Sequence, residues 1–580
     1  MRFIGSSVFC IAILAWAILP LQSQVLTSQP HIGVEQVPLD DNEIYAFIRH
    51  LSVRGVITGF SEAELPLSQF EVAGFLHQAQ PAKLSGAEQS LLTKFLQTYA
   101  LDPRESVTMF PADDAKPLFF DGIFTQQDKY LYQWYDDSTK SDLFVHGIGS
   151  AEYLRQTSPA SESVKLLNLG GRFSGTISGH VGYFMQTTNG VAIGDQQLAL
   201  ADPTLSKNNN LRYFTNFFDF TTAELSYNND WFTGKIAREA VAIGGGYQND
   251  NVLLSANGVP TFDFFSLGAH IGAVRYQAIL GSLVQDTVPY IEPPYPLKYL
   301  AVHDLTFGIG RNAELGFTDI MVFTERLDLA YLNPFSFLGT VKHGLDGQDH
   351  DNGLLGTHVR WQIIPGIEVR GQAALDDLEI NEIGKGYWSN KWAWQFGGMW
   401  AGAFGCPNLD WEAEWIHVEP YTYSHWDTVG AYSSSQTLLG AQIGPNAQSF
   451  WTSLRWIPDS KWTFLLDGQF IERGENIYDS TGNLLYNAGA DYHASMTAQG
   501  APYDTHFLEG RRVNIYTLTA EIEFEPWRGL TIFASGTKKI VDYLGGTPST
   551  PGFDLTGLPV SQAPQELPET LIDLGVKAFF

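Results

Sequence analysis

Apolar and polar residues alternate from about residue 141 to the end of the chain, in segments of about ten residues. In one such segment, Leu355 and Trp361 lie on one face, opposite His358 and Arg360. Successive side chains of a β-strand point to opposite faces, so this period predicts strands with one apolar and one polar face. We count about eighteen segments of this kind. Ten residues is about the length of a tilted strand that crosses a bilayer.

The connections between these segments alternate between short and long. Short links include Pro365-Gly366 and Cys406-Pro407-Asn408. The long links lie near residues 189–216, 240–262, 285–298, 326–353, 378–390, 420–448, 474–510 and 541–568. Outer-membrane barrels have tight turns at the periplasmic rim and long loops at the outer rim. The sequence therefore predicts a transmembrane antiparallel β-barrel of about 18 strands rather than a soluble β-sandwich.

The final segment keeps this alternation and ends on an aromatic residue. Ile572, Leu574, Val576 and Phe580 share one face, and Asp573 lies on the other. A last strand that closes a barrel leaves no backbone group unpaired in lipid. The terminal aromatic resembles the C-terminal signal that outer-membrane assembly machinery reads. We therefore expect the barrel assembly machinery to be a partner through Phe580, and outer-membrane lipid to surround the barrel.

A helical period precedes the strands. Apolar residues at helical spacing mark a first helix, and they are Ile44, Phe47, Ile48 and Leu51. Two later helix starts have the spacing of a capping box, Ser68 with Glu71 and Ser85 with Glu88. We predict a small α-helical bundle over residues 34–110, an irregular join over 111–140 and the barrel over 141–580. An even strand number puts both ends of the barrel, and hence the bundle, in the periplasm.

A secretory signal peptide is predicted over residues 1–23. Met1-Arg2 gives a positive start, residues 8–21 are apolar, and Leu21-Gln22-Ser23 offers a cleavage site. No later stretch of 18 or more apolar residues follows, which argues against a helical membrane protein. Localisation in the outer membrane after export is therefore expected.

Composition and charge fit this class. The 34 Lys and Arg against 63 Asp and Glu give a formal charge of −29, which argues against nucleic acid as a partner. Charged residues make up 17% of the chain, compared with roughly 25% in soluble domains. Aromatic residues make up 13%, which argues against disorder.

Short motifs in the bundle and in one barrel loop resemble the Wzi-type capsule assembly family. Arg54-Gly55-Val56-Ile57 and Leu65-Pro66-Leu67-Ser68 look like that family's turn and the entry into its next helix. Tyr331-Leu332-Asn333-Pro334-Phe335 and Asp351-Asn352-Gly353-Leu354-Leu355-Gly356 look like its loop and following strand. Such proteins are outer-membrane lectins that help hold capsular polysaccharide at the cell surface.

The resemblance implies a non-enzymatic protein without a cofactor that binds and anchors or organises capsular polysaccharide or exopolysaccharide. A polysaccharide export channel beside the barrel is left open as a further partner. The alternative is an outer-membrane porin for small solutes. In that case the bundle, with Gly55-Val56-Ile57-Thr58-Gly59-Phe60, resembles a surface-layer-homology module that grips the cell wall.

Sugar binding needs flat apolar faces for pyranose rings and planar polar groups for hydroxyls. The glycan-binding candidates are aromatic residues of the long loops, namely Tyr421, Tyr423, Trp426, Tyr387, Trp388 and Tyr290. Aromatic residues at strand ends also form the interfacial girdle of a barrel, which is the competing interpretation. Asn333, Pro334, Phe335 and Asn352 are interpreted first as structural: Pro334 fixes a turn, Phe335 covers a rim, and Asn352-Gly353 is a turn.

Charged residues suggest three further hypotheses. Wall residues predicted to face the lumen either line a pore or pair across a blocked one, and they are Arg360, Arg370, Glu368, Asp376, Glu412 and Glu414. Asp346, Asp349 and Asp351 could bind calcium, but the regular calcium-loop pattern is absent, so no metal site is assigned. His343, His350 and Asp349 could be drawn as a catalytic cluster, but no nucleophile or catalytic motif accompanies them.

Overall fold

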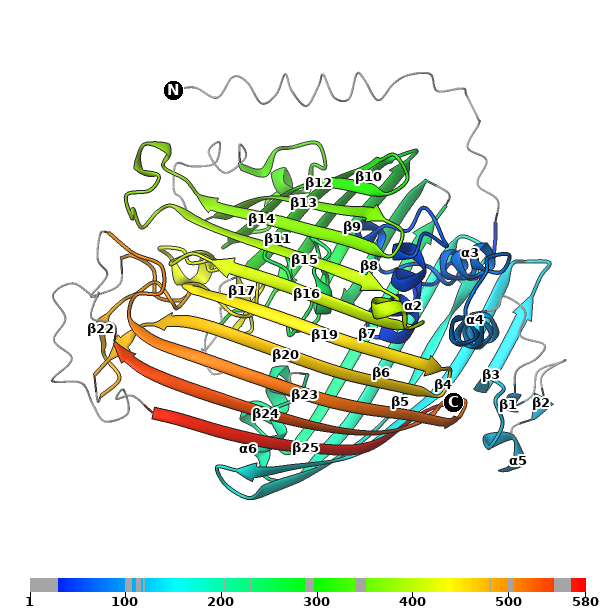
Figure 1. Ribbon diagram of the computed structural model, residues 1–580. Helices are drawn as coiled ribbons and strands as arrows, with labels where there is room; N and C mark the ends of the chain where they lie inside the picture. The colour runs from blue at the N-terminus through cyan, green and yellow to red at the C-terminus, as the bar shows by residue number, and fades with distance from the viewer. Residues whose placement is uncertain are drawn as a thin grey trace.

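The structure is a computed structural model that describes residues 30–99, 107–110, 116–117, 120–202, 204–229, 231–286, 297–339, 351–479, 481–497, 504–546 and 565–580. Within these ranges eighteen strands form a closed antiparallel β-barrel (Figure 1). The barrel strands are β4 (Ser141–Ser158), β5 (Glu162–Ile177), β6 (Val181–Gly194), β7 (Phe217–Asn228), β8 (Phe232–Glu239), β9 (Phe262–Ile271), β10 (Val274–Leu283), β11 (Lys298–Ile309), β12 (Ala313–Thr324), β13 (Asn352–Ile364), β14 (Ile367–Asp377), β15 (Lys391–Ala401), β16 (Leu409–Val418), β19 (Ala447–Asp459), β20 (Trp462–Glu475), β23 (Arg511–Trp527), β24 (Leu530–Gly546) and β25 (Gln565–Phe579).

The α-helices of the described ranges are α2 (Asn42–Val53), α3 (Gln69–Ala79), α4 (Gly86–Thr98), α5 (Phe120–Ile123), α6 (Gln196–Ala199) and α7 (Asn209–Tyr213), and η1 (Glu62–Glu64) is one of several short 3₁₀ helices. The small strands are β1 (Val107–Phe110), β2 (Lys116–Pro117), β3 (Lys129–Asp136), β17 (Ser433–Ser434), β18 (Thr437–Leu438), β21 (Ile477–Tyr478) and β22 (Leu484–Tyr486).

The last strand closes the barrel against the first. β25 pairs antiparallel with β4 from Thr570 to Phe579. The Phe580 N–H then donates to the Gly147 carbonyl at 2.9 Å, and the Phe580 carbonyl accepts from the Gly147 N–H. A closed barrel satisfies the backbone groups that an open sheet edge would leave unpaired. The predicted fold class is confirmed.

Short and long connections lie at opposite ends of the barrel. Residues 365–366 alone join β13 to β14, whereas residues 419–446 join β16 to β19. In Figure 1 the short turns lie at the right, beside the C-terminus, and the long loops lie at the left. The link between β4 and β5 is an exception. It lies at the long-loop end but consists of residues 159–161 alone.

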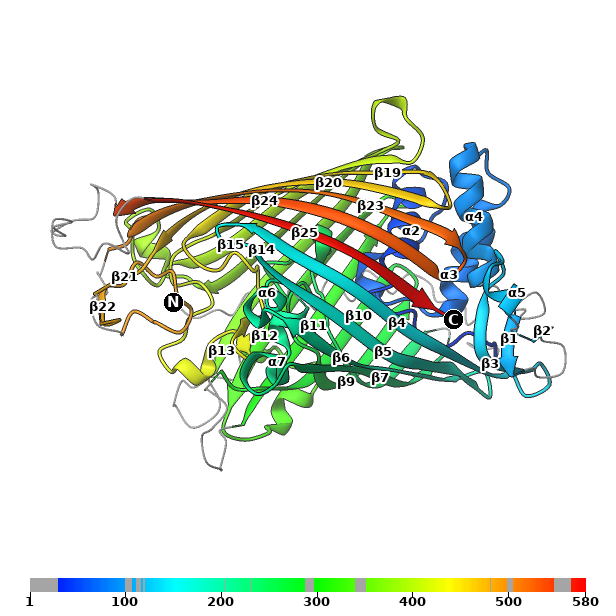
Figure 2. The ribbon, with the colours of Figure 1, turned by 90° about the horizontal axis from the view of Figure 1, so that it is seen from below.

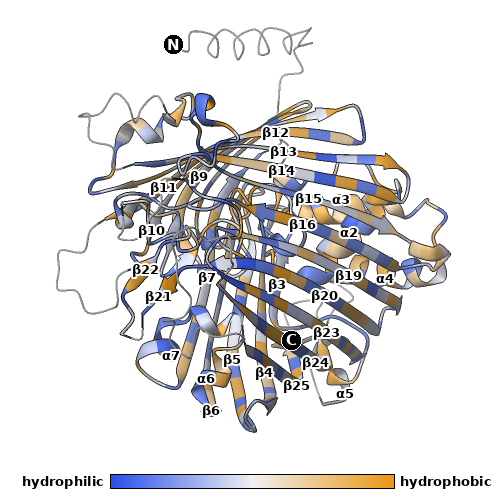
Figure 3. Ribbon diagram, turned by 60° about the vertical axis from the view of Figure 1, so that its left-hand side comes forward, coloured by the Kyte–Doolittle hydropathy of each residue, from blue (hydrophilic) through white to orange (hydrophobic). Residues whose placement is uncertain are grey.

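The barrel wall is apolar outside. On β13, Val359 and Trp361 are exposed on the outer face, whereas His358, the residue before Val359, faces inward and is buried. Figure 3 shows orange and blue residues alternating along the strands. An outward apolar band with a more polar interior is the pattern of strands that cross a bilayer. None of the helices in the described part of the chain is long and apolar enough to span a membrane.

The sequence explains where α3 and α4 begin and where α2 ends. Ser68 and Ser85 each form a capping box, with Glu71 and Glu88, so both predicted helix starts are confirmed. Helix α2 ends in a Schellman motif around Gly55, which adopts a φ of +72° that favours glycine. Figure 2 shows α2, α3 and α4 at the end of the barrel where the C-terminus lies.

The segment predicted as an irregular join contains regular structure. Strand β3 pairs antiparallel with the start of β4, from Tyr132 with Val145 to Asp136 with Ser141. Strand β1, at the end of the range predicted as the helical bundle, pairs parallel with β3. The sequence pattern did not indicate these strands, because β1 and β2 are short and β3 has apolar residues on both faces. The chain thus enters the barrel through a hairpin rather than through a loop.

Candidate functional site

A buried ion-pair network fastens the helical bundle to the inner wall of the barrel. Arg49 of α2 contacts the Glu62 carboxylate of η1 through Nε at 2.8 Å and Nη2 at 3.1 Å. Arg370 of β14 contacts the same carboxylate at 2.7 Å and Glu368 at 2.6 Å. Burial alone would raise the pKa of the Glu62 carboxyl, but Arg370 and Arg49 together hold that pKa well below its usual value. The bundle is therefore held by a charged carboxylate.

Further contacts spread this attachment around the barrel mouth. His50 Nδ1 of α2 lies 2.7 Å from Asp410 of β16. Lys94 Nζ of α4 lies 2.7 Å from Glu525 of β23. Gln362 Nε2 of β13 donates to the Ser52 and Val53 carbonyls at the end of α2, at 3.1 and 2.6 Å. The bundle thus covers the barrel end that carries the short turns.

The charged wall residues pair rather than line an open channel. Arg360 contacts Glu368 at 2.6 Å and donates to the Ser52 hydroxyl of α2 at 2.8 Å. Farther up the wall, Lys391 contacts Asp376 at 3.1 Å. Arg360, Arg370, Glu368 and Asp376 therefore pair with neighbouring strands or with the bundle. Glu412 instead lines a cavity, and Glu414 accepts from the Tyr247 N–H at 3.1 Å.

Three long loops fold into the lumen at the opposite end. Residues 195–216, which contain α6 and α7, pack on the inward residues Val164 and Leu166 of β5. The second and third loops, residues 240–261 and 419–446, pack against each other. Both also contact inward-facing residues of the strands from β9 to β16. The Tyr213 hydroxyl of the first loop donates to Gln436 Oε1 of the third at 2.8 Å. We call this group of loops the loop plug.

The loop plug contains an apolar core. Its buried loop residues are Val252, Leu253, Leu254, Val259, Tyr423, Tyr432, Leu438, Leu439, Ala441 and Ile443. They pack on inward wall residues that are also apolar, among them Leu300, Val302, Ile320, Val322, Leu354, Ala374, Ala393, Ile416 and Val418. The lumen of a porin is polar and filled with water. Here the upper part of the lumen is packed like a protein interior.

Two of the glycan-binding candidates lie inside the loop plug. Tyr421 and Tyr423 are fully buried, and their hydroxyls donate to the carbonyls of Asn487 and Val252, each at 2.8 Å. Gly440 packs so closely on Tyr423 that a Cβ there would lie 2.5 Å from the ring. Both tyrosines therefore have a packing role, and neither ring face is open to a sugar in this structure. Their clustering in one loop reflected a core that sequence alone does not distinguish from a binding surface.

The other candidates lie nearer to solvent. Trp426 is 51% exposed in the same loop. Tyr387 and Trp388 are half-buried in the loop between β14 and β15, with ring centroids 5.6 Å apart. Tyr290 lies outside the described residues. For all six candidates the glycan-binding role stays a prediction.

The motif residues are partly structural. The Asn333 side chain accepts from the Phe335 N–H at 3.1 Å, so Asn333 and Pro334 do form a turn. Phe335 is 94% exposed, so the expectation that it covers a rim is wrong for the described chain. Asn352 begins β13 and pairs opposite Val322, so it is a strand residue and not a turn residue. Its neighbour Gly353 gave the misleading turn signal.

The calcium and catalytic hypotheses lie mostly outside the described residues. Asp346, Asp349, His343 and His350 all fall between residues 340 and 350. Asp351 is described, and its carboxylate accepts from the Tyr331 hydroxyl at 2.5 Å. Across the described ranges no group of three metal-ligating side chains comes together.

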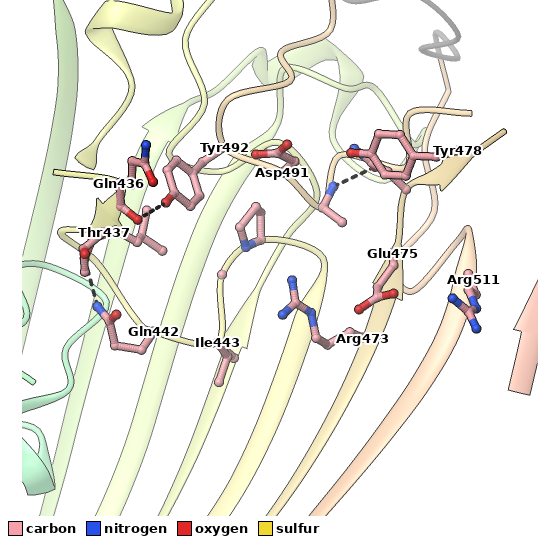
Figure 4. Close-up of a pocket in the computed structure, with 15 residues that line it drawn as sticks. Gln436, Thr437, Gln442, Ile443, Arg473, Glu475, Tyr478, Asp491, Tyr492 and Arg511 are labelled. Carbon is pink, nitrogen blue, oxygen red and sulfur yellow. Dashed lines mark hydrogen bonds between the residues drawn. The ribbon is translucent and has the colours of Figure 1, made fainter. Parts of the chain in front are cut away.

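The candidate binding site is a pocket at the long-loop end that the sequence did not single out. We call it the loop pocket; its volume is about 510 Å³. It is lined by Gln436, Thr437, Leu438, Gln442, Ile443, Gly444, Pro445, Arg473, Glu475, Asn476, Tyr478, Ala490, Asp491, Tyr492 and Arg511. Figure 4 shows Tyr492 and Gln436 on one side and Arg473, Glu475 and Arg511 on the other. Its lining comes from two loops and two strand ends that are distant in sequence, so no local motif marks it.

Hydrogen bonds hold the loops of this pocket in place. Asn476 Oδ1 accepts from the Ala488 and Ala490 N–H groups at 2.8 and 3.3 Å. The Tyr492 hydroxyl donates to the Gln436 carbonyl at 3.2 Å. These contacts join residues 476–492 to the loop plug. The pocket therefore has a largely preformed lining of aromatic, amide and charged groups, which suits a small polar ligand.

A second, larger cavity of about 920 Å³ lies between the loop plug and the bundle. The bundle contributes Tyr45 and Arg49, the wall Trp451 and Arg455, and the loop plug Asn257. The cavity is thus bounded by the helical bundle on one side and by the loop plug on the other.

Comparisons with known proteins give a fold but no family. Neither protein-family models nor curated protein sequences match the chain. Among solved structures, Wzi of Escherichia coli aligns over 94% of this chain and 99% of its own, with a TM-score of 0.55 and 14% identity. It is described as a carbohydrate-binding β-barrel involved in group 1 capsule assembly. Two Pseudomonas aeruginosa barrels, OccK8 (OprE) and OprD, have TM-scores of 0.40 and 8% identity, over 76% and 77% of this chain and 98% and 99% of theirs.

Proposed function

We propose that this protein binds capsular or other surface polysaccharide and anchors or organises it at the cell surface, without catalysis. The observation that carries the proposal is the filled lumen. The loop plug packs an apolar core inside the barrel, and the helical bundle covers the other end. A barrel filled in this way is a scaffold that presents its long loops and the loop pocket. The fold shared with Wzi, whose own description is carbohydrate binding, supports the same function.

The proposal places the barrel in the outer membrane. Its apolar exterior faces lipid, the long loops face outward, and the bundle lies in the periplasm. The barrel assembly machinery would recognise the last strand, β25, together with the terminal Phe580. The signal peptide would direct export, and its cleavage would leave the mature chain. A polysaccharide export channel remains a proposed partner.

A porin for small solutes needs a continuous wet path. The apolar core of the loop plug argues against such a path, since water would have to cross a region where buried side chains already pack. The surface-layer-homology interpretation of the bundle has no independent support, because the contacts of the bundle run to the barrel wall. Neither alternative is therefore proposed.

Deleting the gene from its bacterial host tests the proposed function. We expect the polysaccharide attached to the cells to fall severalfold and the polysaccharide in the medium to rise, with the total unchanged. Uronic-acid or total-hexose assays on the cell pellet and the medium measure the two fractions. Restoring the intact gene should restore attachment. Polysaccharide that remains attached to the cells in the deletion strain would overturn the proposal.

A further inference from the structure

The loop pocket contains a buried arginine, Arg511, whose guanidinium packs over the Tyr543 ring at 4.1 Å but whose carboxylate-binding edge has no hydrogen-bond partner among the described residues. Arg511 is only 8% exposed, and its Nε and Nη2 atoms make no hydrogen bond to any described residue. The same two atoms of Arg49 hold Glu62, and those of Arg238 hold Asp263 at 2.7 and 2.5 Å. Arg511 thus presents, unpaired, the edge that this chain uses elsewhere to bind a carboxylate.

A second cation lies beside it. Arg473 and Glu475 are two residues apart on β20 and therefore share a face, and Glu475 pairs opposite Arg511 on β23. Arg473 Nε also has no partner within the described ranges. Leaving a buried charged donor unpaired costs free energy, and an arginine has donors only. A ligand that relieves this cost must bring acceptors, and a carboxylate matches the planar guanidinium edge with two parallel hydrogen bonds.

We propose that the loop pocket binds an acidic sugar unit of the polysaccharide, with the sugar carboxylate held by Arg511 and Arg473. This inference rests on the proposed function and names its substrate class. Tyr492 and Tyr478 supply the aromatic part of the lining beside these cations. A volume of about 510 Å³ falls within the range of small-molecule pockets, roughly 300–1,000 Å³.

The charge of the whole chain makes the two arginines decisive. The formal charge is −29, so an acidic polymer is repelled by most of the protein. Of the two acids in the pocket, Asp491 is engaged by its own loop, since its Oδ1 accepts from the His493 N–H at 2.9 Å. Glu475 pairs opposite Arg511 and offsets part of its charge, but it makes no hydrogen bond with Nε or Nη2 of Arg511. The unpaired arginine donors therefore mark where an anionic sugar can dock.

Binding of matched polymers to the full-length protein in detergent tests this inference. The probes are oligomers of polygalacturonate, their methyl esters, which keep the rings but lose the charge, hyaluronan oligomers and dextran. We expect isothermal titration calorimetry to show binding of an acidic probe at least tenfold tighter than of the methyl esters or dextran. Arg511→Lys keeps the charge but loses the forked edge, so its affinity for the acidic probe should fall about ten- to hundredfold.

The matched control is Arg512→Lys. Arg512 is the next residue of β23, points to the opposite face and pairs with Glu472 at 3.5 Å. It should leave the affinity unchanged. Arg473→Gln tests the second arginine of the site. Each variant is checked for folding by comparing its gel mobility with and without heating.

Three results would contradict the inference or the proposed function on which it rests. Equal binding of the acidic probes and their neutral counterparts would overturn the acidic-sugar inference and leave polysaccharide binding standing. Full affinity in folded Arg511→Lys and Arg473→Gln would overturn the assignment to the loop pocket. Binding of none of the probes, together with unchanged attachment of polysaccharide in the deletion strain, would overturn the proposed function itself.

Discussion

Replacing Glu62 by alanine is expected to destabilise the attachment of the helical bundle by about 3–5 kcal/mol, the cost of breaking a buried ion pair from one side. The reason is that Arg49 and Arg370 would keep their charges in a buried place without a carboxylate between them. Limited proteolysis of the folded barrel should then cut the bundle at protease concentrations that leave the wild type intact.

The control is Glu382→Ala, which removes an exposed partner of Lys385 at 3.3 Å. Exposed pairs contribute about 0–1 kcal/mol, so this variant should resist protease like the wild type. Equal resistance of Glu62→Ala and wild type would contradict the role of Glu62 in fastening the bundle.

The same carboxylate gives the attachment a defined pH dependence. Because the folded pKa of Glu62 lies well below its unfolded value, its contribution is fully present above the unfolded pKa of about 4.3. That contribution is lost only as the pH falls through the lowered folded pKa. The bundle of the wild type should therefore stay protected from protease at pH 5.

Replacing Tyr423 by alanine is expected to loosen the loop plug by about 3–5 kcal/mol, the usual range for removing a buried aromatic ring. The ring is fully buried against Tyr432, with centroids 5.6 Å apart, and its hydroxyl satisfies the Val252 carbonyl. Amide hydrogen exchange in residues 423–441 should accelerate about a hundred- to several-thousandfold, while exchange in the strands of the barrel stays slow.

Trp426→Ala is the control in the same loop. Trp426 is half exposed, so its removal should change exchange little, by about 0.5 kcal/mol or less in stability. Tyr423→Phe separates the hydroxyl from the ring and should have an intermediate effect. Slow exchange in residues 423–441 of Tyr423→Ala would show that these residues do not depend on the apolar core.

The barrel was predictable from the sequence because its pattern is repeated and physically required. A strand such as β13 must place Trp361 toward lipid and His358 toward the lumen, and the period of two follows directly. The helix starts at Ser68 and Ser85 were predictable because a capping box is local in sequence. The hairpin β3–β4 was missed, because β3 carries apolar residues on both faces and does not show a period of two.

The interior of the barrel could not be predicted in the same way. An aromatic cluster such as Tyr421 and Tyr423 has the same sequence signature whether its loop extends into solvent or folds into the lumen. Burial there depends on contacts with residues about 170 positions away, such as Val252. The loop pocket was invisible for a similar reason, since Arg511 and Tyr492 meet only after the loops have folded. Local spacing carries no record of such contacts.

Conductance across a planar lipid bilayer tests most directly whether the lumen is filled. Full-length protein, inserted from detergent with its folding checked by gel mobility, should give no steady current above the bare bilayer. Glu62→Ala should add only brief openings, because the loop plug still fills the other end. Large, stable ohmic steps from the intact protein would show a continuous water path and would contradict the account of a closed scaffold.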